Sequence, residues 1–385
     1  MTPFLLGLSP SVEDSALLST ESAYQRAGEN TGNLAFCYAI NRLMGGNLQS
    51  VMWDADPAAI DAMGQVGILP LANQLGAHAD LGGLVPNFRQ LDCAMVGMGL
   101  GAQADNLHQE VDIPQGTLDW VRAIQDHSPT DAPNITVRGK FTLRALEKYG
   151  LADKAVALGC PTLFISPDKS LGKTIARRFD GAPKYIAVAS GHQSWTHLSR
   201  IEASLVQIAA SNHGAYICQS PIEMVRLGRG ECAILSKEVR DICRNYVAPH
   251  LNDDEFVSWC NRHAYSFFSA DAWLEHIRRF DFVIGTRIHG VMLALQAGVP
   301  ALCIVHDSRT RELCETMKVP HVAASDVSGG LKRDDIGRLF KFDPDEFDAH
   351  RASLASGYRN FMLGNGLTPA PYLANLAALV NGAAK

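Results

Sequence analysis

Apolar and polar positions along the chain switch repeatedly between strand-like runs and helical spacing. In the first half, short apolar runs alternate with segments whose apolar residues recur at helical intervals. The predicted strands are 4–8, 50–53, 94–97, 134–137 and 162–166, and the clearest predicted helices are 34–44 and 141–149. Such an alternation predicts a parallel sheet covered by helices.

A second alternation of the same kind begins after residues 181–183. Its predicted strands are 185–189, 215–219, 282–285 and 300–305, and its predicted helices are 196–211, 236–247, 270–279 and 291–297. A chain of 385 residues also exceeds what one hydrophobic core usually supports. We therefore expect an α/β domain at 1–175, a second at 176–343, and a helical segment at 344–385.

The composition narrows the functional class. A net charge of −6 argues against nucleic-acid binding, which needs a basic surface. The nine cysteines are scattered and several fall in apolar runs, which predicts reduced, mostly buried thiols. The sequence has neither a signal-like basic and apolar start nor an apolar run of ~18 residues, so we expect a cytoplasmic protein without a transmembrane segment.

The most informative segment is the predicted strand–helix–strand unit at 281–305. Arg287 and His289 stand between its first strand and its helix, where open α/β sheets bind ligands and where helix N–H groups meet anions. Arginine supplies a fixed cation, and histidine can change its protonation near neutral pH. In the alternative interpretation, Arg287 pairs with a neighbouring acid and His289 only caps the helix.

Two further polar clusters follow predicted strands of the same half. His306 and Arg309 come after the strand 300–305, and His192 comes after the strand 185–189. Strand ends of one sheet lie close together, so these side chains could meet the same ligand. Solvated turns remain the alternative for both clusters.

Two glycine motifs are incomplete. Residues 97–101 have GxGxG spacing without an immediate helix, which favours a loop that approaches a ligand or a plain tight turn over a dinucleotide site. Residues 172–174 imitate the end of a phosphate-binding loop, but Pro167 occupies the position of its first glycine. Histidines and acids lack metal-ligand spacing, so we expect no catalytic metal.

The run 281–290, with its Gly-Thr-Arg-Ile-His-Gly core, resembles the signature of the polysaccharide pyruvyltransferase family, as do 298–300 and the loop at His306. Weaker similarities at 30–33, 97–99, 137–138 and 159–161 occur in the family's order. Ile288 replaces the usual leucine, and His306 and Arg309 stand where the family often has tyrosine and lysine.

This resemblance implies two Rossmann-like domains facing a cleft, as in GT-B enzymes. It implies a transferase of exopolysaccharide biosynthesis that takes phosphoenolpyruvate as donor and forms a pyruvate ketal on a sugar or glycan, without a redox cofactor. The N-terminal domain would be the acceptor side and the C-terminal domain the donor side.

Within that family pattern, Arg287 and His289 take the catalytic roles. Arg138, His192, Gly290, His306 and Arg309 are assigned to substrate binding. A GT-B glycosyltransferase that uses a nucleotide sugar and a non-catalytic glycan-binding relative remain alternatives. The acceptor sugar, the division of acid and base roles and any self-association stay open.

Overall fold

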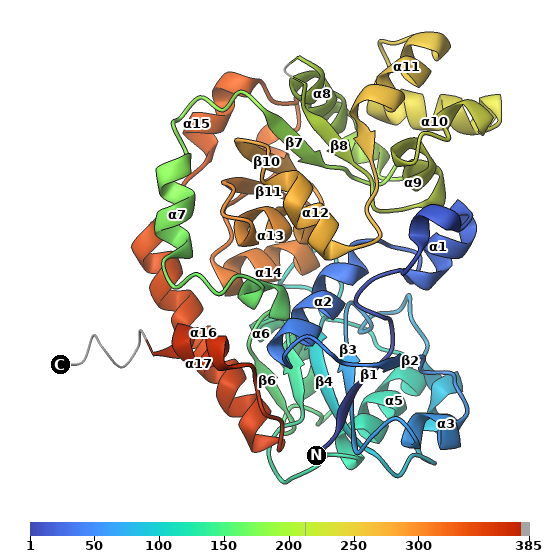
Figure 1. Cartoon of the computed structure of the whole chain (residues 1–385), viewed down its shortest axis with the longest axis vertical. Coiled ribbons are helices and arrows are strands. Elements are labelled where there is room, and N and C mark those ends of the chain that lie inside the picture. The colour runs from blue at the N-terminus through green and yellow to red at the C-terminus, as the bar shows by residue number, and fades with distance from the viewer. Residues whose placement is uncertain (212, 379–385) are drawn as a thin grey trace.

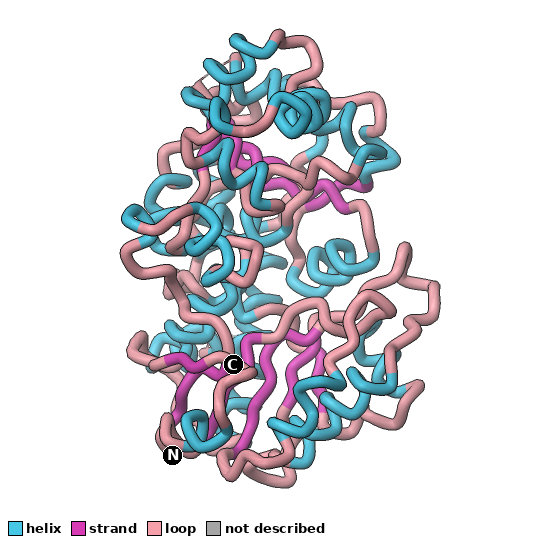
Figure 2. Tube along the Cα trace, turned by 90° about the vertical axis from the view of Figure 1, so that its right-hand side faces the viewer, coloured by secondary structure: helices cyan, strands magenta, loops and turns pink. Residues whose placement is uncertain are grey.

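The chain folds around two parallel sheets of six strands each. The computed structural model describes residues 1–211 and 213–378. Helices surround both sheets (Figure 1), and a view from the side shows the strands in two separate groups, one above the other (Figure 2). The expected α/β fold with two Rossmann-like sheets is confirmed, and the likeness to GT-B enzymes stays a prediction.

The first sheet uses strands from the first 157 residues, in the order β2-β1-β3-β4-β5-β6. Its strands are β1 (Pro3–Leu6), β2 (Ser50–Val51), β3 (Val66–Pro70), β4 (Ala94–Leu100), β5 (Ile135–Val137) and β6 (Ala155–Ala157). Every strand pair is parallel. The carboxyl ends of these strands therefore share one edge of the sheet.

The second sheet has the order β12-β11-β10-β7-β8-β9. Its strands are β7 (Ile186–Ala189), β8 (Ala215–Ile217), β9 (Ala264–Tyr265), β10 (Phe282–Gly285), β11 (Ala301–Val305) and β12 (His321–Ala323). On one side of β7 lie β8 and then β9, which follow it in the sequence. On the other side of β7 lie β10, β11 and β12, in that order. The direction thus reverses between β7 and β10, and ligands of open α/β sheets bind at such a switch point.

Helices connect the strands and cover the sheets. They are α1 (Thr20–Arg26), α2 (Asn33–Leu43), α3 (Pro57–Asp61), α4 (Val85–Phe88), α5 (Gln115–Asp126), α6 (Lys140–Glu147), α7 (Leu171–Arg178), α8 (Ser199–Ala210), α9 (Ile222–Gly228), α10 (Lys237–Val247), α11 (Asp253–His263), α12 (Ala270–Ile277), α13 (Ile288–Gln296), α14 (Ser308–Met317), α15 (Ile336–Leu339), α16 (Pro344–Gly364) and α17 (Pro371–Ala377).

The buried apolar residues do not divide cleanly between the two sheets. One cluster joins residues of β1 and α2 to the strands and helices of the second sheet, and a second fills the other face of the first sheet. A small third cluster packs α1 against α9. Segments of the first 40 residues thus contribute to the core around the second sheet, and the predicted domain boundaries stay a prediction.

The long helix α16 lies along one side of the molecule (Figure 1), and its His350 Nε2 lies 2.7 Å from the Thr316 carbonyl oxygen in α14. Its Arg351 guanidinium donates to backbone carbonyls in the stretch that leads to α7, including Leu163 at 2.9 Å. Further along, the Tyr358 hydroxyl donates to the Gly159 carbonyl at 3.2 Å, just after β6. These contacts hold α16 against the segment that connects β6 to α7.

Two expected elements are wrong. Residues 162–166 are not a strand, because Pro161 starts a short 3₁₀ turn, Pro161–Phe164, that is buried beside α2. Residues 97–101 are not a loop as a whole, since β4 continues to Leu100. The glycines instead shape the strand end, and Gly99 adopts a positive φ of 90° where the pairing with β5 shifts register.

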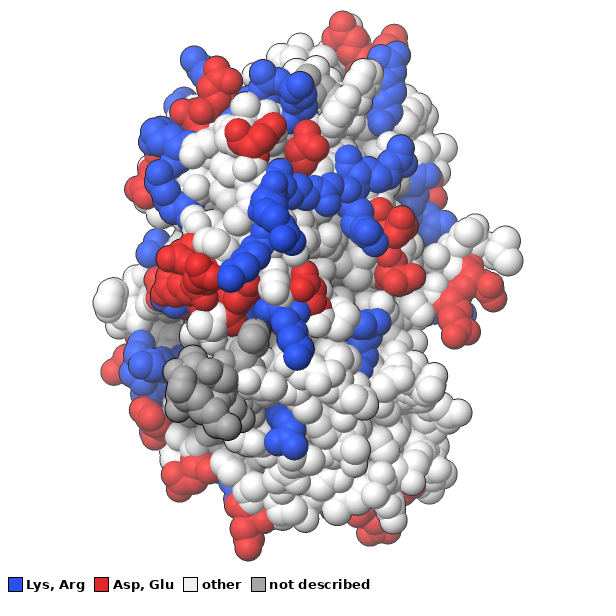
Figure 3. Space-filling view, turned by 60° about the vertical axis from the view of Figure 1, so that its left-hand side comes forward, with Lys and Arg blue, Asp and Glu red and all other residues white. Residues whose placement is uncertain are grey.

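Charged side chains of both signs cover the surface. On the face in Figure 3, lysines and arginines gather over the upper half with acidic groups among them. Lys173, for example, lies 3.1 Å from Asp345. Across residues 1–211 and 213–378, no helix combines the length and apolar character that crossing a bilayer requires.

Candidate functional site

The segments that follow β7 and β10 meet at the switch point of the second sheet. Gly285 and Ala189, the last residues of these strands, are paired in register. Arg287 is the N-cap of α13, so its neighbour His289 lies in the first turn of that helix. A fixed cation and an imidazole thus stand where the helix presents unpaired N–H groups.

Arg287 is held from two sides. Its Nη2 donates to the Ser220 carbonyl at 3.2 Å and to the Ser220 hydroxyl at 2.6 Å. Its guanidinium carbon lies 4.9 Å from the centre of the Trp195 ring, a cation–π contact. Burial, followed by the nearby Arg309, lowers the pKa of Arg287 to about 10, so it stays protonated at neutral pH. Its Nε is buried without a partner and is free for a ligand.

Arg138 reaches the same place from the first sheet. It follows β5 and is only 3% exposed. Its Nε donates to the Gly99 carbonyl at 3.1 Å, and a Cβ at Gly101 would lie 2.5 Å from the Arg138 Cδ. The glycine run 97–101 therefore makes room for an arginine side chain and supplies the acceptor that orients it.

Replacing Gly101 with alanine is expected to raise the Michaelis constant for the donor that the family resemblance implies roughly tenfold, because the new methyl group displaces Arg138 and costs a charge-assisted hydrogen bond of about 1.5–3 kcal/mol. Initial rates at varied donor concentration measure the effect. Gly83→Ala is the control, since its Cβ would meet nothing within 4 Å. An unchanged Michaelis constant in a folded Gly101→Ala protein would show that Arg138 does not contact the donor.

Arg309 completes the cationic group from the start of α14. Its Nη2 donates to Asp307 at 2.8 Å and its Nε donates to the same carboxylate oxygen at 3.2 Å. Burial alone would raise the pKa of Asp307, but Arg309 and His306 lower it overall, so Asp307 is a carboxylate. Arg309 is thus partly neutralised, whereas Arg138 and Arg287 have no carboxylate in an ion pair among the described residues.

These side chains surround a cavity of about 120 Å³ between the two sheets. Its lining residues, among those that the structure describes, are Asn30, Asn33, Ala72, Asn73, Arg138, Gln219, Thr286, Arg287, Ile288, His289, Arg309 and Thr310. The Gln219 Nε2 and the Thr286 Oγ1 are buried without hydrogen-bond partners. Unpaired buried donors beside arginines indicate a site for a small anion, since a ligand would satisfy them.

His289 is neutral at neutral pH. Burial, and then the positive charges of Arg138, Arg309 and Arg287, lower its pKa to about 3. Its Nε2 lies 3.9 Å from the Cys160 Sγ, and its ring lies 5.3 Å from that of Phe36. The expectation that its pKa lies near neutral pH is therefore wrong, because sequence spacing reveals neither the burial of this side chain nor the three arginines that converge on it.

The depressed pKa of His289 makes the folded protein sensitive to acid. The pKa of this histidine is near 6.5 in the unfolded chain and about 3 in the folded chain. Between these two pH values the unfolded chain therefore binds one more proton than the folded chain. The stabilising contribution of neutral His289 is complete above pH 6.5 and is lost as the pH falls toward 3. We expect the melting temperature of the wild type to fall more steeply from pH 7 to 5 than that of His289→Gln. The melting temperatures are measured by scanning calorimetry. Equal dependence of the melting temperature on pH in the wild type and in His289→Gln would contradict this prediction.

A protein-family model matches residues 123–308 of the chain. The matching family is polysaccharide pyruvyl transferase. The resemblance seen in the run 281–290 is thereby confirmed over slightly less than half of the chain. The matched range holds all the predicted site residues except Arg309, which is the next residue after its end.

No curated protein matches the chain. Solved structures with a similar arrangement include the S. aureus MnaA–UDP co-structure, at 8% identity over 94% of this chain and 97% of that one, with a TM-score of 0.44. A UDP-N-acetylglucosamine 2-epimerase from Rickettsia bellii has 12% identity, coverage of 99% and 98%, and a TM-score of 0.43. The UDP-GlcNAc 2-epimerase of Methanocaldococcus jannaschii, in complex with UDP-GlcNAc and UDP, has 10% identity, coverage of 92% and 99%, and a TM-score of 0.43. Identities this low carry no information on function.

The predicted site residues fall into two groups. Arg138, Arg287, His289 and Arg309 line the small cavity together. His192 lies beside it, with its Nδ1 2.7 Å from the Ser194 hydroxyl, and burial and then Arg287 lower its pKa. Its assignment to substrate binding stays a prediction.

Gly290 and His306 lie elsewhere. A Cβ on Gly290 would stand 2.7 Å from the Ala189 Cβ, so this glycine lets α13 pack closely on β7 and does not line the small cavity in the described part of the chain. His306 lines a larger neighbouring cavity. The assignment of Gly290 and His306 to substrate binding stays a prediction.

Sequence reasoning missed several polar residues at the site. Trp195, which stacks on Arg287, lies in a loop with no local pattern. Gln219 ends the strand-like run 215–219, and that position at a strand end was the signal that could have identified it. In the described residues, no group of three or more histidine, cysteine or acidic side chains could hold a metal ion.

Proposed function

We propose that the protein transfers the enolpyruvyl unit of phosphoenolpyruvate to two hydroxyls of a sugar, forming a pyruvate ketal. The observation that carries this proposal is the convergence of Arg138, Arg287 and Arg309 on one small cavity that also contains His289. The match to the polysaccharide pyruvyl transferase family supports the same reaction. We place the reaction in the cytoplasm, where phosphoenolpyruvate is formed, and its product in exopolysaccharide biosynthesis.

Charge and size both favour phosphoenolpyruvate as the donor. The molecule has a carboxylate and a phosphate within a few bonds, and guanidinium groups bind both through paired N–H donors. The cavity of about 120 Å³ is below the ~300–1,000 Å³ typical of sites for drug-sized ligands. A small, highly charged donor fits these features better than a nucleotide sugar does.

In the reaction we propose, the methylene carbon of the donor gains a proton, and one sugar hydroxyl attacks the adjacent carbon. The bond from that carbon to the phosphate oxygen then breaks, and a second hydroxyl of the sugar closes the ketal. One hydroxyl proton in total ends on the new methyl group and the other leaves with inorganic phosphate. Arg287 and Arg138 hold the anionic groups of the donor through these steps.

His289 is the group we assign to proton transfer. Its lowered pKa keeps it neutral at neutral pH, so it can accept a proton but cannot donate one as an imidazolium. The negative charges of the donor offset the arginines that lower its pKa. Donor binding therefore raises the proton affinity of His289 when a sugar hydroxyl must lose its proton, and we assign it the role of base in that step.

Isothermal titration calorimetry with phosphoenolpyruvate and with a nucleotide sugar tests the donor assignment. We expect phosphoenolpyruvate to bind at one site per chain, and to bind more weakly in Arg287→Ala. Tight binding of the nucleotide sugar, with no heat from phosphoenolpyruvate, would instead favour a glycosyltransferase.

We also propose that catalysis requires no metal or redox cofactor, because the arginines supply the positive charge that a metal would otherwise bring to the phosphate. Turnover is expected to survive exhaustive chelation with EDTA. The measurement is phosphate release from phosphoenolpyruvate before and after chelation. Loss of turnover that Mg²⁺ or Mn²⁺ restores would contradict this part of the proposal.

A further inference from the structure

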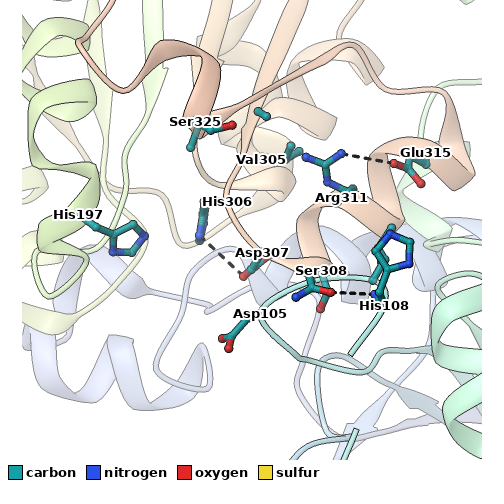
Figure 4. A pocket seen from close by; sticks show the side chains of 14 residues that line it. Asp105, His108, His197, Val305, His306, Asp307, Ser308, Arg311, Glu315 and Ser325 are labelled. Atoms are coloured by element: carbon teal, nitrogen blue, oxygen red, sulfur yellow. Dashed lines mark hydrogen bonds and ion pairs between the residues drawn. The ribbon is translucent and has the colours of Figure 1, made fainter. Parts of the chain in front are cut away.

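Figure 4 shows a second, larger cavity of about 610 Å³. Its lining residue Asp307 accepts a hydrogen bond from Arg309, which lines the smaller cavity with Arg138 and Arg287. One wall comes from residues 105–108, in the segment that follows β4 of the first sheet. The opposite wall comes from the second sheet, where β11 ends at Val305 and residues 306–308 follow it, and His197 stands across from them. Its volume lies within the range of ~300–1,000 Å³ that is usual for small-molecule sites.

The two cavities are separated by a thin layer of side chains. Asp307 lines the larger cavity, and its carboxylate holds Arg309, which lines the smaller one. Trp195 contacts both sides, with its ring 4.5 Å from that of His306 and 4.9 Å from the guanidinium carbon of Arg287. A ligand in the larger cavity would therefore sit directly beside a donor held by Arg287.

His306 has a buried ring nitrogen that a ligand in the larger cavity could pair with. Its side chain is only 5% exposed, yet its Nε2 has no hydrogen-bond partner. Burial, and then Arg309, His197 and Arg287, lower its pKa to about 4 against the opposing effect of Asp307, so the ring is neutral. A neutral imidazole can exchange one donor and one acceptor bond with a hydroxyl group.

The larger cavity differs from the smaller one in charge. Its lining holds three carboxylates, Asp105, Asp307 and Glu315, and one guanidinium, Arg311. Arg311 lies 3.9 Å from Glu315, and Asp307 is paired with Arg309 outside the cavity. Asp105 forms no ion pair among the described residues. Carboxylates accept hydrogen bonds from hydroxyls, and an unpaired one repels a ligand of its own charge.

We infer that the larger cavity is the acceptor site and that it takes an uncharged sugar unit, such as a neutral hexose, in preference to a uronic acid or a phosphorylated sugar. This inference rests on the proposed function, because it assigns the donor to the neighbouring cavity. We assign the discrimination between neutral and acidic sugars to Asp105, which lines the larger cavity and forms no ion pair among the described residues.

The experiment measures binding of methyl glycosides to the full chain by saturation-transfer difference NMR. The probes are the methyl glycosides of galactose, glucose and mannose and the corresponding methyl uronides. Excess inorganic phosphate occupies the cationic cavity, so that a uronide cannot bind there through its carboxylate. Asp105→Lys reverses the charge on an exposed loop position, and Asp54→Lys is the matched control at an exposed aspartate outside both cavities.

We expect at least one neutral glycoside to bind roughly tenfold or more tightly than its uronide, and Asp105→Lys to remove that preference, whereas Asp54→Lys leaves it unchanged. His306→Phe, which keeps a ring against Trp195, should weaken the neutral glycoside. Equal binding of uronides in the wild type, or an unchanged preference in Asp105→Lys, would overturn the inference. Phosphoenolpyruvate binding is measured separately by calorimetry. Its absence, with the sugar preference intact, would overturn the donor assignment and support the sugar site.

Discussion

His289→Ala is expected to lower turnover roughly 10²-fold or more, the scale of losing a general acid–base group. The change removes the proton acceptor that stands among Arg138, Arg287 and Arg309. The fold should persist, because the side chain is only partly buried at the wall of the cavity. Steady-state phosphate release at saturating donor and acceptor measures the effect.

The control for this prediction is His250→Ala, which removes an exposed histidine outside both cavities. Donor binding by calorimetry should survive in both variants, because the arginines remain. If a folded His289→Ala protein keeps near wild-type turnover, the residue is only part of the helix start, and the proton-transfer role moves to His192 or His306.

Arg287→Lys is expected to raise the Michaelis constant for phosphoenolpyruvate by roughly tenfold or more, with a smaller change in turnover. Lysine keeps the positive charge but lacks the planar guanidinium group. In Arg287, Nη2 of that group binds Ser220, and Nε is unpaired and available to the donor. It also loses the flat contact with Trp195. A charge-assisted hydrogen bond of about 1.5–3 kcal/mol accounts for a change of this size.

Initial rates at varied donor concentration and fixed acceptor concentration separate the Michaelis constant for the donor from the turnover number. Arg89→Lys provides the comparison, since Arg89 is exposed and lines neither cavity. An unchanged donor constant in Arg287→Lys, or a change confined to the acceptor constant, would show that Arg287 does not hold the donor.

The fold class followed from the sequence because parallel sheets buried on both faces need continuous apolar runs. The strands β7, β10 and β11 are of this kind, and each was predicted to within a residue or so. The short strands β6, β9 and β12 were missed, since two or three residues at a sheet edge carry no distinct pattern. The central strand β3 was also missed, although all five of its residues are buried. Only tertiary pairing makes them strands.

The candidate site was predicted in outline for a different reason. A strand–helix–strand unit fixes where Arg287 and His289 lie, and the carboxyl edge of a parallel sheet brings other strand ends to the same place. The residue spacing could not predict the protonation state of His289, because its pKa is lowered by burial and then by Arg138, which comes from the first sheet. The role of the glycines at 99 and 101 was hidden in the same way, since their partner lies 37 or more residues further along the chain.

The most direct test of the central claim is a one-pot NMR experiment with phosphoenolpyruvate and a panel of neutral glycosides. We predict a new methyl singlet from a pyruvate ketal in the proton spectrum, with one equivalent of inorganic phosphate in the phosphorus spectrum, and neither signal with His289→Ala on the same timescale. Phosphate release without a ketal methyl, or consumption of a nucleotide sugar with phosphoenolpyruvate untouched, would contradict the account.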